Sequence, residues 1–375
     1  MKNNTPLPLF YILFLLLFYG QASHAEANPD SAAIKIKSAL KGKFAFSGFA
    51  EAYYGYDFGK PQSGNRPNFI YSHNRHNEVN LNLIYAKLNY SASHLRTNLA
   101  LMYGTYANAN LAAEPFPLRY IFEANIGFRL SKKKELWLDG GIFPSHIGFE
   151  SAISKDCWTL TRSIMAENTP YFETGAKLSY TSDNGKLFAS VLLLNGWQRI
   201  QRIKGNSLPS FGWQITYKPN TVFSLNSSTF FGANQPDADR KMRYYHNFYG
   251  IIQPADQFGI TVGIDFGAEQ KNVASKKYNL WYSPAVIVRY VPTAKVAMAA
   301  RYEYYNDAAG VVIATATPNG FQTHGVSANL DINVLKNLLW RIEGKGYFSK
   351  DEVFQLHGKP SSKNYAITTS LAMSF

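Results

Sequence analysis

Cysteine is nearly absent from the sequence, since Cys157 is the only one in 375 residues. A single thiol excludes an internal disulfide and a metal cluster held by cysteines. Long apolar runs are also missing, because no stretch after residue 25 approaches the roughly 18 apolar residues that indicate a spanning helix. Sustained helical periodicity is lacking too, apart from a turn or two near residues 31–40. The fold must therefore depend on neither disulfides nor membrane helices.

Charged residues are scarce, at 17% of the sequence against roughly 25% in average soluble proteins, whereas aromatic residues reach 15%. The mean hydropathy is nevertheless −0.22, which is typical of a chain that alternates apolar and polar residues. The net charge is +13. Because the basic residues are dispersed along an exported chain, we expect no nucleic-acid partner and favour an anionic solute or a lipopolysaccharide surface.

The N-terminus predicts export. Residues 1–25 combine Lys2 with an apolar run of about a dozen residues, and Ser23 and Ala25 suit the subsites of a signal peptidase. The alternative is a membrane anchor, but the run is shorter than the roughly 20 residues that a spanning helix needs. We therefore expect a signal peptide over 1–25, a short leader over 26–43 and a β-barrel over 44–375.

The rest of the chain has a period of two. In RYIFEANIGFRLS, residues 119–131, side chains of the two kinds alternate as they do in a strand with two different faces. Most segments of this kind span about 10–14 residues, more than the roughly 5–6 of soluble strands and enough to cross a bilayer at a tilt. They cover 44–57, 75–91, 94–106, 119–131, 135–144, 171–182, 186–198, 209–219, 221–233, 243–254, 257–268, 277–291, 294–307, 320–333, 337–349 and 363–375.

The connections alternate in length. Short turns such as 131–135 and 219–221 are followed by longer links such as 144–170 and 350–362. Transmembrane barrels have short periplasmic turns, long external loops and an even number of strands, and in lipid a sheet must close to satisfy its backbone. The pattern therefore predicts an all-β fold, a transmembrane antiparallel β-barrel of about sixteen strands in the outer membrane of a Gram-negative bacterium.

The chain ends on YAITTSLAMSF, in which apolar side chains occupy alternate positions. Closure of a barrel requires this last segment to pair with the first, 44–57, so that its apolar face meets lipid. Leu371, Met373 and the terminal Phe375 resemble the signal that the outer-membrane barrel-assembly machinery recognises, and we expect that machinery to be a partner.

Charges inside the strands repeatedly fall on one parity. Arg301 and Glu303 alternate with apolar residues, and so do Arg341 and Glu343. A charge facing lipid at mid-depth costs about 2–4 kcal/mol, so we expect these four side chains to face the lumen. They could line the pore or merely form ion pairs along the wall.

Two stretches carry a family resemblance. The segment GIFPSHIGFESAISKDCWTLTRSIMAENTPYFETGAKLSY, continuing to LLLNGWQ, resembles the porin-like outer-membrane β-barrels of Bacteroidetes-type bacteria. MAARYEYYND, followed by Gly310, is similar to the arginine–glutamate–aromatic strand of the wider second group of β-barrel porins. The resemblance implies an outer-membrane porin of mostly unassigned substrate, and it brings no catalytic residues. A barrel of about sixteen strands is too wide for side chains to fill, so we expect a water-filled channel for passive diffusion of small hydrophilic solutes, without a cofactor. The positive net charge favours a mild preference for anions.

Link 144–170 is the longest and would be the third external loop. In general porins the third loop folds into the barrel and narrows it, so we expect this segment to form the constriction, although it could instead lie over the mouth. Its predicted pore-lining charges are Glu150, Lys155, Asp156, Arg162 and Glu167.

Other functions remain as alternatives. One is a channel selective for a single nutrient, with Arg162 and the aromatic residues of 144–170 binding the solute, and another is a structural or adhesive barrel with a blocked lumen. His73 and His76 in HNRHNE form a weak metal-binding pattern. No nucleophile and base are spaced as an enzyme would need. General porins are often trimers, so a homo-oligomer is a further expectation, although no sequence feature fixes it.

Overall fold

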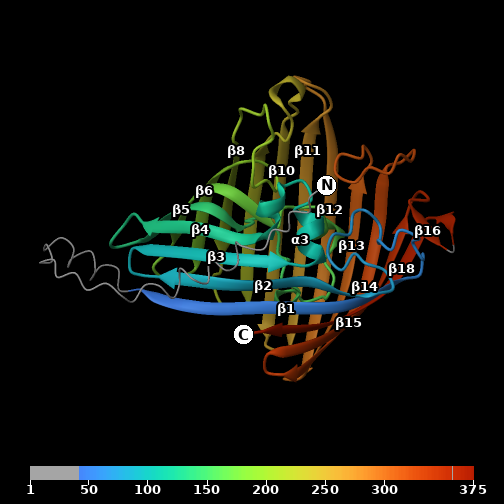
Figure 1. Cartoon of the computed structure of the whole chain (residues 1–375), viewed down its shortest axis with the longest axis horizontal. Helices are drawn as coiled ribbons and strands as arrows, with labels where there is room; N and C mark the ends of the chain where they lie inside the picture. The colour runs from blue at the N-terminus through green and yellow to red at the C-terminus, as the bar shows by residue number, and fades with distance from the viewer. Residues whose placement is uncertain (1–41, 357) are drawn as a thin grey trace, which may run out of the picture. The chain divides into compact units, whose positions relative to one another are not determined.

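The computed structural model describes residues 42–356 and 358–375. The signal peptide expected over 1–25, and the leader up to residue 41, lie outside the described residues. The described chain forms a closed barrel of antiparallel strands in the order β1-β18-β15-β14-β13-β12-β11-β10-β9-β8-β7-β6-β5-β4-β3-β2 (Figure 1). These sixteen wall strands confirm the fold class and the predicted strand number.

The wall strands are β1 (Lys43–Asp57), β2 (Val79–Ser91), β3 (Leu95–Tyr103), β4 (Ile121–Arg129), β5 (Glu135–Pro144), β6 (Phe172–Thr181), β7 (Leu187–Leu194), β8 (Ser210–Tyr217), β9 (Phe223–Gly232), β10 (Arg243–Ala255), β11 (Phe258–Gln270), β12 (Tyr278–Thr293), β13 (Val296–Asp307), β14 (Phe321–Leu335), β15 (Leu338–Ser349) and β18 (Lys363–Ser374). The long links hold short helices, which are α3 (Thr105–Asn110), η1 (Phe116–Tyr120), η2 (Ser154–Asp156), α4 (Ile164–Glu167) and η3 (Asp237–Asp239). Outside the wall, β16 (Phe354–Leu356) pairs with β17 (Lys359–Ser361).

The last strand closes the barrel, as the alternation at the C-terminus predicts. β18 pairs with β15 on one side and with β1 on the other. The backbone N–H of Phe375 donates to the Gly48 carbonyl at 3.1 Å, and the Gly48 N–H donates back to the Phe375 carbonyl at 3.0 Å. The Phe375 ring also lies 5.8 Å from the ring of Phe46. The chain end is therefore held to the first strand down to its final residue.

Side-chain parity separates the two faces of the wall. In β13, Tyr302 is 49% exposed on the outer face, while its neighbours Arg301 and Glu303 are buried. In β15, Trp340 is exposed and Arg341 is buried. The outer face is rich in exposed large apolar residues, which suits contact with lipid. The interior holds the charged residues, as the parity of the sequence predicts.

Two predicted segments differ from the structure. The strand expected over 94–106 ends at Tyr103, and α3 follows it, with Tyr106 buried inside the barrel. The link expected over 350–362 contains the β16–β17 hairpin. In both places the residues pack on other loops, a contact that the period of two does not reveal. No helix among the described residues is long and apolar enough to cross a membrane.

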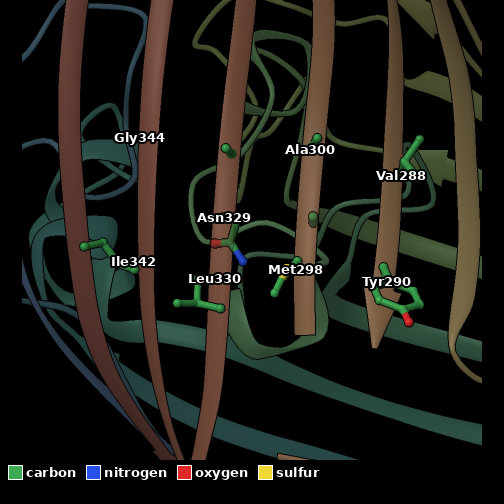
Figure 2. A pocket seen from close by; sticks show the side chains of 10 residues that line it. Val288, Tyr290, Met298, Ala300, Asn329, Leu330, Ile342 and Gly344 are labelled. Carbon is green, nitrogen blue, oxygen red and sulfur yellow. The ribbon is translucent and has the colours of Figure 1, made fainter. Parts of the chain in front are cut away.

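A hollow of about 530 Å³ lies along β12–β15 (Figure 2). It forms where three small residues, Ala300, Ala328 and Gly344, lie side by side in register on neighbouring strands. Larger side chains such as Met298 and Ile342 line it as well (Figure 2). Ala300, Ala328 and Gly344 share the parity of exposed Tyr302, so the hollow belongs mainly to the outer face and is not part of a path through the lumen.

Candidate functional site

The segment between β5 and β6 crosses the inside of the barrel. Its backbone N–H groups at Leu160 and Thr161 donate to Asn329 of β14 and Glu343 of β15, at 3.0 and 2.5 Å. In the ring of sixteen strands, β14 lies eight places from β6, so the contact joins opposite sides of the wall. The prediction that this loop folds inward, rather than lying over the mouth, agrees with these contacts.

Only glycine fits at one strand position that carries the loop. Gly141 of β5 has a φ of +128°, and a Cβ there would come within 2.2 Å of the Ala124 carbonyl oxygen. Both the backbone conformation and the close approach exclude a larger residue. Gly141 therefore helps to set the geometry at the base of the loop.

Arg301 of β13 joins the loop to the opposite wall. Its guanidinium donates to the Thr161 carbonyl at 2.7 Å, to the Thr159 hydroxyl at 2.7 Å and to Glu343 at 3.0 Å. It also forms a 3.3 Å ion pair with Glu150 of the loop. Arginine suits this position because its guanidinium has five donors and stays charged even when it is buried.

Neighbouring ion pairs repeat this arrangement. Arg341 binds both carboxylate oxygens of Asp331 at 2.7 and 2.9 Å and donates to the Ser154 and Cys157 carbonyls of the loop. The Lys345 ammonium lies 3.0 Å from Glu303. The predicted inward orientation of Arg301, Glu303, Arg341 and Glu343 is thus what the structure has. All four are covered by the loop and hold it, rather than lining open water.

Arg162 is fully buried, which corrects its expected role as a pore-lining charge. Its guanidinium donates to the carbonyls of Ser151, Leu160 and Ala152 at 2.6, 2.6 and 2.8 Å. Each of these bonds links two parts of the same loop. The side chain therefore fastens the loop to itself and has no face left for a solute, so it does not grip one.

The two predicted glutamates of the loop are also buried, which corrects the expectation that they face the pore. Glu150 accepts from the backbone N–H of Ser163 at 3.0 Å. Glu167 accepts from the N–H groups of Tyr71 and Ser72 at 2.9 and 3.1 Å, and so ties this loop to the segment after β1. Burial raises the pKa of Glu167, although Arg162 and the two N–H groups favour its ionised form.

Only two of the five predicted loop charges reach water. Lys155 and Asp156 are exposed at the turn of η2. Lys155 donates to the hydroxyl of Ser374 at the end of β18. Cys157, which follows, is buried, and burial raises the pKa of its thiol, so it is not a reactive group. The free charge of the loop is therefore one cation and one anion.

A family profile described as "Putative beta-barrel porin-2, OmpL-like" matches residues 43–375, nearly the whole described chain. The chain belongs to this porin family. The resemblance in the central stretch is confirmed at the level of the family, whereas an origin in Bacteroidetes-type bacteria stays a prediction. A comparison with curated proteins gives no match.

Solved structures of porins share the fold of this porin. The anion-selective porin from Comamonas acidovorans has a TM-score of 0.60 at 8% identity, covering 89% of this chain and 100% of its own. The outer-membrane channel DcaP of Acinetobacter baumannii has a TM-score of 0.59 at 12% identity, covering 89% and 97%. OmpF of Salmonella typhi, in complex with daunomycin, has a TM-score of 0.58 at 8% identity, covering 89% and 98%. At these identities the likeness shows the fold alone.

Two inward-facing cations of the porin were missed from the sequence. Lys177 of β6 lies over the Phe143 ring at 4.6 Å, and Arg289 of β12 is half-buried. Within the described residues, neither side chain forms a hydrogen bond or a salt bridge. In contrast, Lys87 and Arg96 are paired with Glu123 and Asp139. Parity alone could have placed Lys177 inside, because it shares a face with Glu173 in YFETGAK.

Histidines of the porin hold its loops in place. Both ring nitrogens of His146 face acceptors at 2.7 Å, which are Glu173 and the Thr229 carbonyl, so the ring is held in its charged form. Burial disfavours that charge, but Glu173 outweighs it and raises the pKa of His146. His73 contacts Glu51 of β1 at 3.0 Å, and the same carboxylate accepts from Ser154 of the inward loop.

The histidine pair in HNRHNE is separated by the fold. His73 faces Glu51, whereas the Nδ1 of His76 accepts from the backbone N–H of Asp57 at 3.0 Å. The described residues contain no group of three side chains that could hold a metal ion. Each histidine thus bonds a different residue of β1.

The residues expected to guide assembly lie on the outer face of the porin. Leu371, Met373 and Phe375 are 46%, 39% and 60% exposed. Ala372, between them, is fully buried and faces Glu51 of β1. The three apolar side chains are thus free to contact lipid or another protein.

Proposed function

We propose that this outer-membrane porin passes small hydrophilic solutes by passive diffusion and that the loop 144–170 is its constriction. The observation that carries the proposal is the set of hydrogen bonds that joins this loop to β13, β14 and β15, on the far side of the lumen. A barrel of sixteen strands is otherwise wide enough for an aqueous channel. Solutes would pass beside the loop, where charge and width select them.

A mild preference for anions follows from the charges that remain free. Lys155, Lys177 and Arg289 offer positive charge toward the interior, while Asp156 offers a single negative one. The other inward carboxylates described above are already engaged by cations, hydroxyls or backbone N–H groups. The exposed or unbonded charges named above are thus three cations and one anion, an excess that would raise the local concentration of anions.

The partners follow from the two faces of the wall. Lipid and lipopolysaccharide would cover the apolar outside, and the barrel-assembly machinery would recognise the exposed end of β18. Export through a signal peptide over 1–25 precedes both steps. A homo-oligomer is compatible with this surface, and OmpT of Vibrio cholerae, which shares the fold with a TM-score of 0.56, is described in a trimer form.

A second candidate is a channel selective for one nutrient. It is favoured by the rigid fastening of the loop, since Glu150, Arg162 and Glu167 are all buried and leave little freedom to widen the passage. Saturable transport of one solute would support it over general diffusion.

Single-channel recording of the refolded protein in a planar bilayer under a salt gradient tests the proposal. We expect stepwise, roughly ohmic openings and a reversal potential of the sign given by anion preference. A folded, heat-modifiable barrel without steps would refute the diffusion channel and favour a structural or adhesive barrel with a blocked lumen.

A further inference from the structure

A cavity of about 250 Å³ lies between the inward loop and the wall strands β2, β3 and β4, which are neighbours in the barrel (Figure 1). Loop residues such as Phe149 and Ser151 form one side of it, and Tyr85, Lys87 and Phe122 form part of the other. The volume lies just below the roughly 300–1,000 Å³ of drug-sized ligand sites, so it suits a single small ring. A solute held in this cavity would lie directly beside the loop.

The lining is open to a solute, because all five of these side chains are partly exposed. At the external end the cavity is bounded by Tyr106 of α3, which is 1% exposed. Toward the short-turn end the wall continues with Asn89 and Asn98, which are half-buried and hydrogen-bonded to each other. A solute therefore reaches the cavity along this polar part of the wall.

Three aromatic rings stand in a row on the wall side of the cavity. The ring of Tyr85 stacks on that of Phe122 at 4.9 Å, with 9° between the planes, and on that of Phe49 at 5.9 Å. Phe122 ends the row, so among the described residues its second face has no ring partner. Aromatic rings attract one another in offset stacks. The end of the row therefore offers an aromatic face to a flat ring in the cavity.

The loop side of the cavity is aromatic as well, and its ring is held in place. Phe149 meets Tyr249 of β10 edge to face at 5.6 Å. A Cβ at Gly263 of β11 would come within 2.5 Å of the Phe149 ring, so the glycine makes room for that ring. Since packing already fixes Phe149, little conformational entropy is left to lose when a ligand binds.

Lys87 supplies a polar group. Its side chain is 23% exposed, and its ammonium donates one hydrogen bond, to Glu123. An ammonium has three donors, so two remain for a solute. The two acids of the lining are engaged, Glu123 by Lys87 and Glu150 by the backbone N–H of Ser163. The cavity therefore favours a solute with an oxygen that accepts hydrogen bonds from Lys87.

We propose that this cavity binds a small aromatic carboxylate, with its ring on Phe122 and its carboxylate on Lys87. The proposal rests on the proposed function and deepens it, because it names a class of solute that is held beside the constriction. One ring fits the volume, its flat face meets the end of the aromatic row, and its anionic oxygens suit the ammonium. A puckered aliphatic ring would lose the stacking, and a cationic solute would meet Lys87 with the wrong sign.

Isothermal titration of the folded barrel in detergent tests the proposal, with benzoate as the probe. Cyclohexanecarboxylate has the same charge without a flat ring, and benzylamine has the flat ring with the opposite charge. Benzoate should bind more tightly than either, by about 2- to 10-fold over cyclohexanecarboxylate, the expected contribution of one aromatic pair.

Two variants test the residues. Phe122→Leu should weaken benzoate binding about 2- to 10-fold, and Lys87→Gln should weaken it about 10-fold, the expected effect of losing a hydrogen bond to a charged group. The matched control is Phe128→Leu on the same strand, since Phe128 is 49% exposed on the outer face and its replacement should leave benzoate binding unchanged. Lys87→Gln alters a half-exposed polar side chain and keeps the test available if Phe122→Leu does not fold.

Three results would overturn the proposal. They are the absence of benzoate binding by the folded protein, equal affinity for benzoate and cyclohexanecarboxylate, and benzoate affinity that is unchanged in a folded Phe122→Leu or Lys87→Gln variant. Channel recordings on the same samples separate the two proposals. Benzoate binding without conductance steps would refute the diffusion channel alone, and conductance steps without benzoate binding would refute the aromatic site alone.

Discussion

Replacing Arg162 with methionine should loosen the inward loop without opening the wall. The change keeps most of the side-chain volume but removes three hydrogen bonds to the carbonyls of Ser151, Leu160 and Ala152. Hydrogen bonds to a charged group contribute about 1.5–3 kcal/mol each, and the freed carbonyls are left buried. Because such terms are not additive, we expect the loop to lose about 3–5 kcal/mol of anchoring free energy, as when a buried ionic partner is removed.

Single-channel recording provides the measurement. Arg162→Met should raise the mean conductance and the current noise, because the loop then samples positions away from β13–β15. The reversal potential should change little, since the guanidinium is fully buried and does not face the path. Limited proteolysis of the folded barrel should show faster cleavage within 144–170.

The matched control is Lys155→Met on the same loop. Its side chain is exposed, so the stability should change by no more than about 0.5 kcal/mol, while the reversal potential should move toward cations. Unaltered noise and proteolysis in Arg162→Met, together with a large shift of its reversal potential, would refute the reasoning and restore the pore-lining role.

Three further predictions concern the interior charges and the chain end. The double variant Lys177→Gln/Arg289→Gln should shift the reversal potential toward cations, and Asp156→Asn should shift it the other way; equal reversal potentials in the unmodified protein and both variants would contradict the assignment of these charges to the path. Deleting Phe375 removes both backbone hydrogen bonds to Gly48 and should lower the yield of heat-modifiable barrel in outer membranes, whereas a normal yield would place the assembly signal elsewhere. The charged form of His146, whose pKa is raised in the folded protein, stabilises the fold fully below the ordinary histidine pKa of about 6.5. This contribution is lost as the pH rises through the pKa that His146 has in the folded protein. Resistance to urea should therefore fall on the alkaline side. His146→Gln should abolish that part of the pH dependence, and an unchanged profile would exclude His146 as its source.

The wall of the barrel could be predicted because its information is local. A strand places successive side chains on opposite faces, so the alternation around Arg301 and Glu303, or around Arg341 and Glu343, assigns each residue to lipid or lumen without any knowledge of its neighbours. The same alternation in the last strand, with the length pattern of the links, predicts closure with the first strand. The sequence by itself thus determined the fold class, the strand number and the parity of the charges.

Only the tertiary structure decided what the interior charges do. The partners of Arg301 at Thr159 and Thr161 lie more than a hundred positions away in the sequence, and so does the Thr161 N–H that donates to Glu343. Burial of Arg162 depends on how the loop folds back on itself, and the exposure of Lys155 depends on where η2 turns. The sequence of a long loop does not show whether a charged side chain is exposed to water or bonded to a backbone carbonyl. Its role depends on long-range contacts, which the period of a strand does not encode.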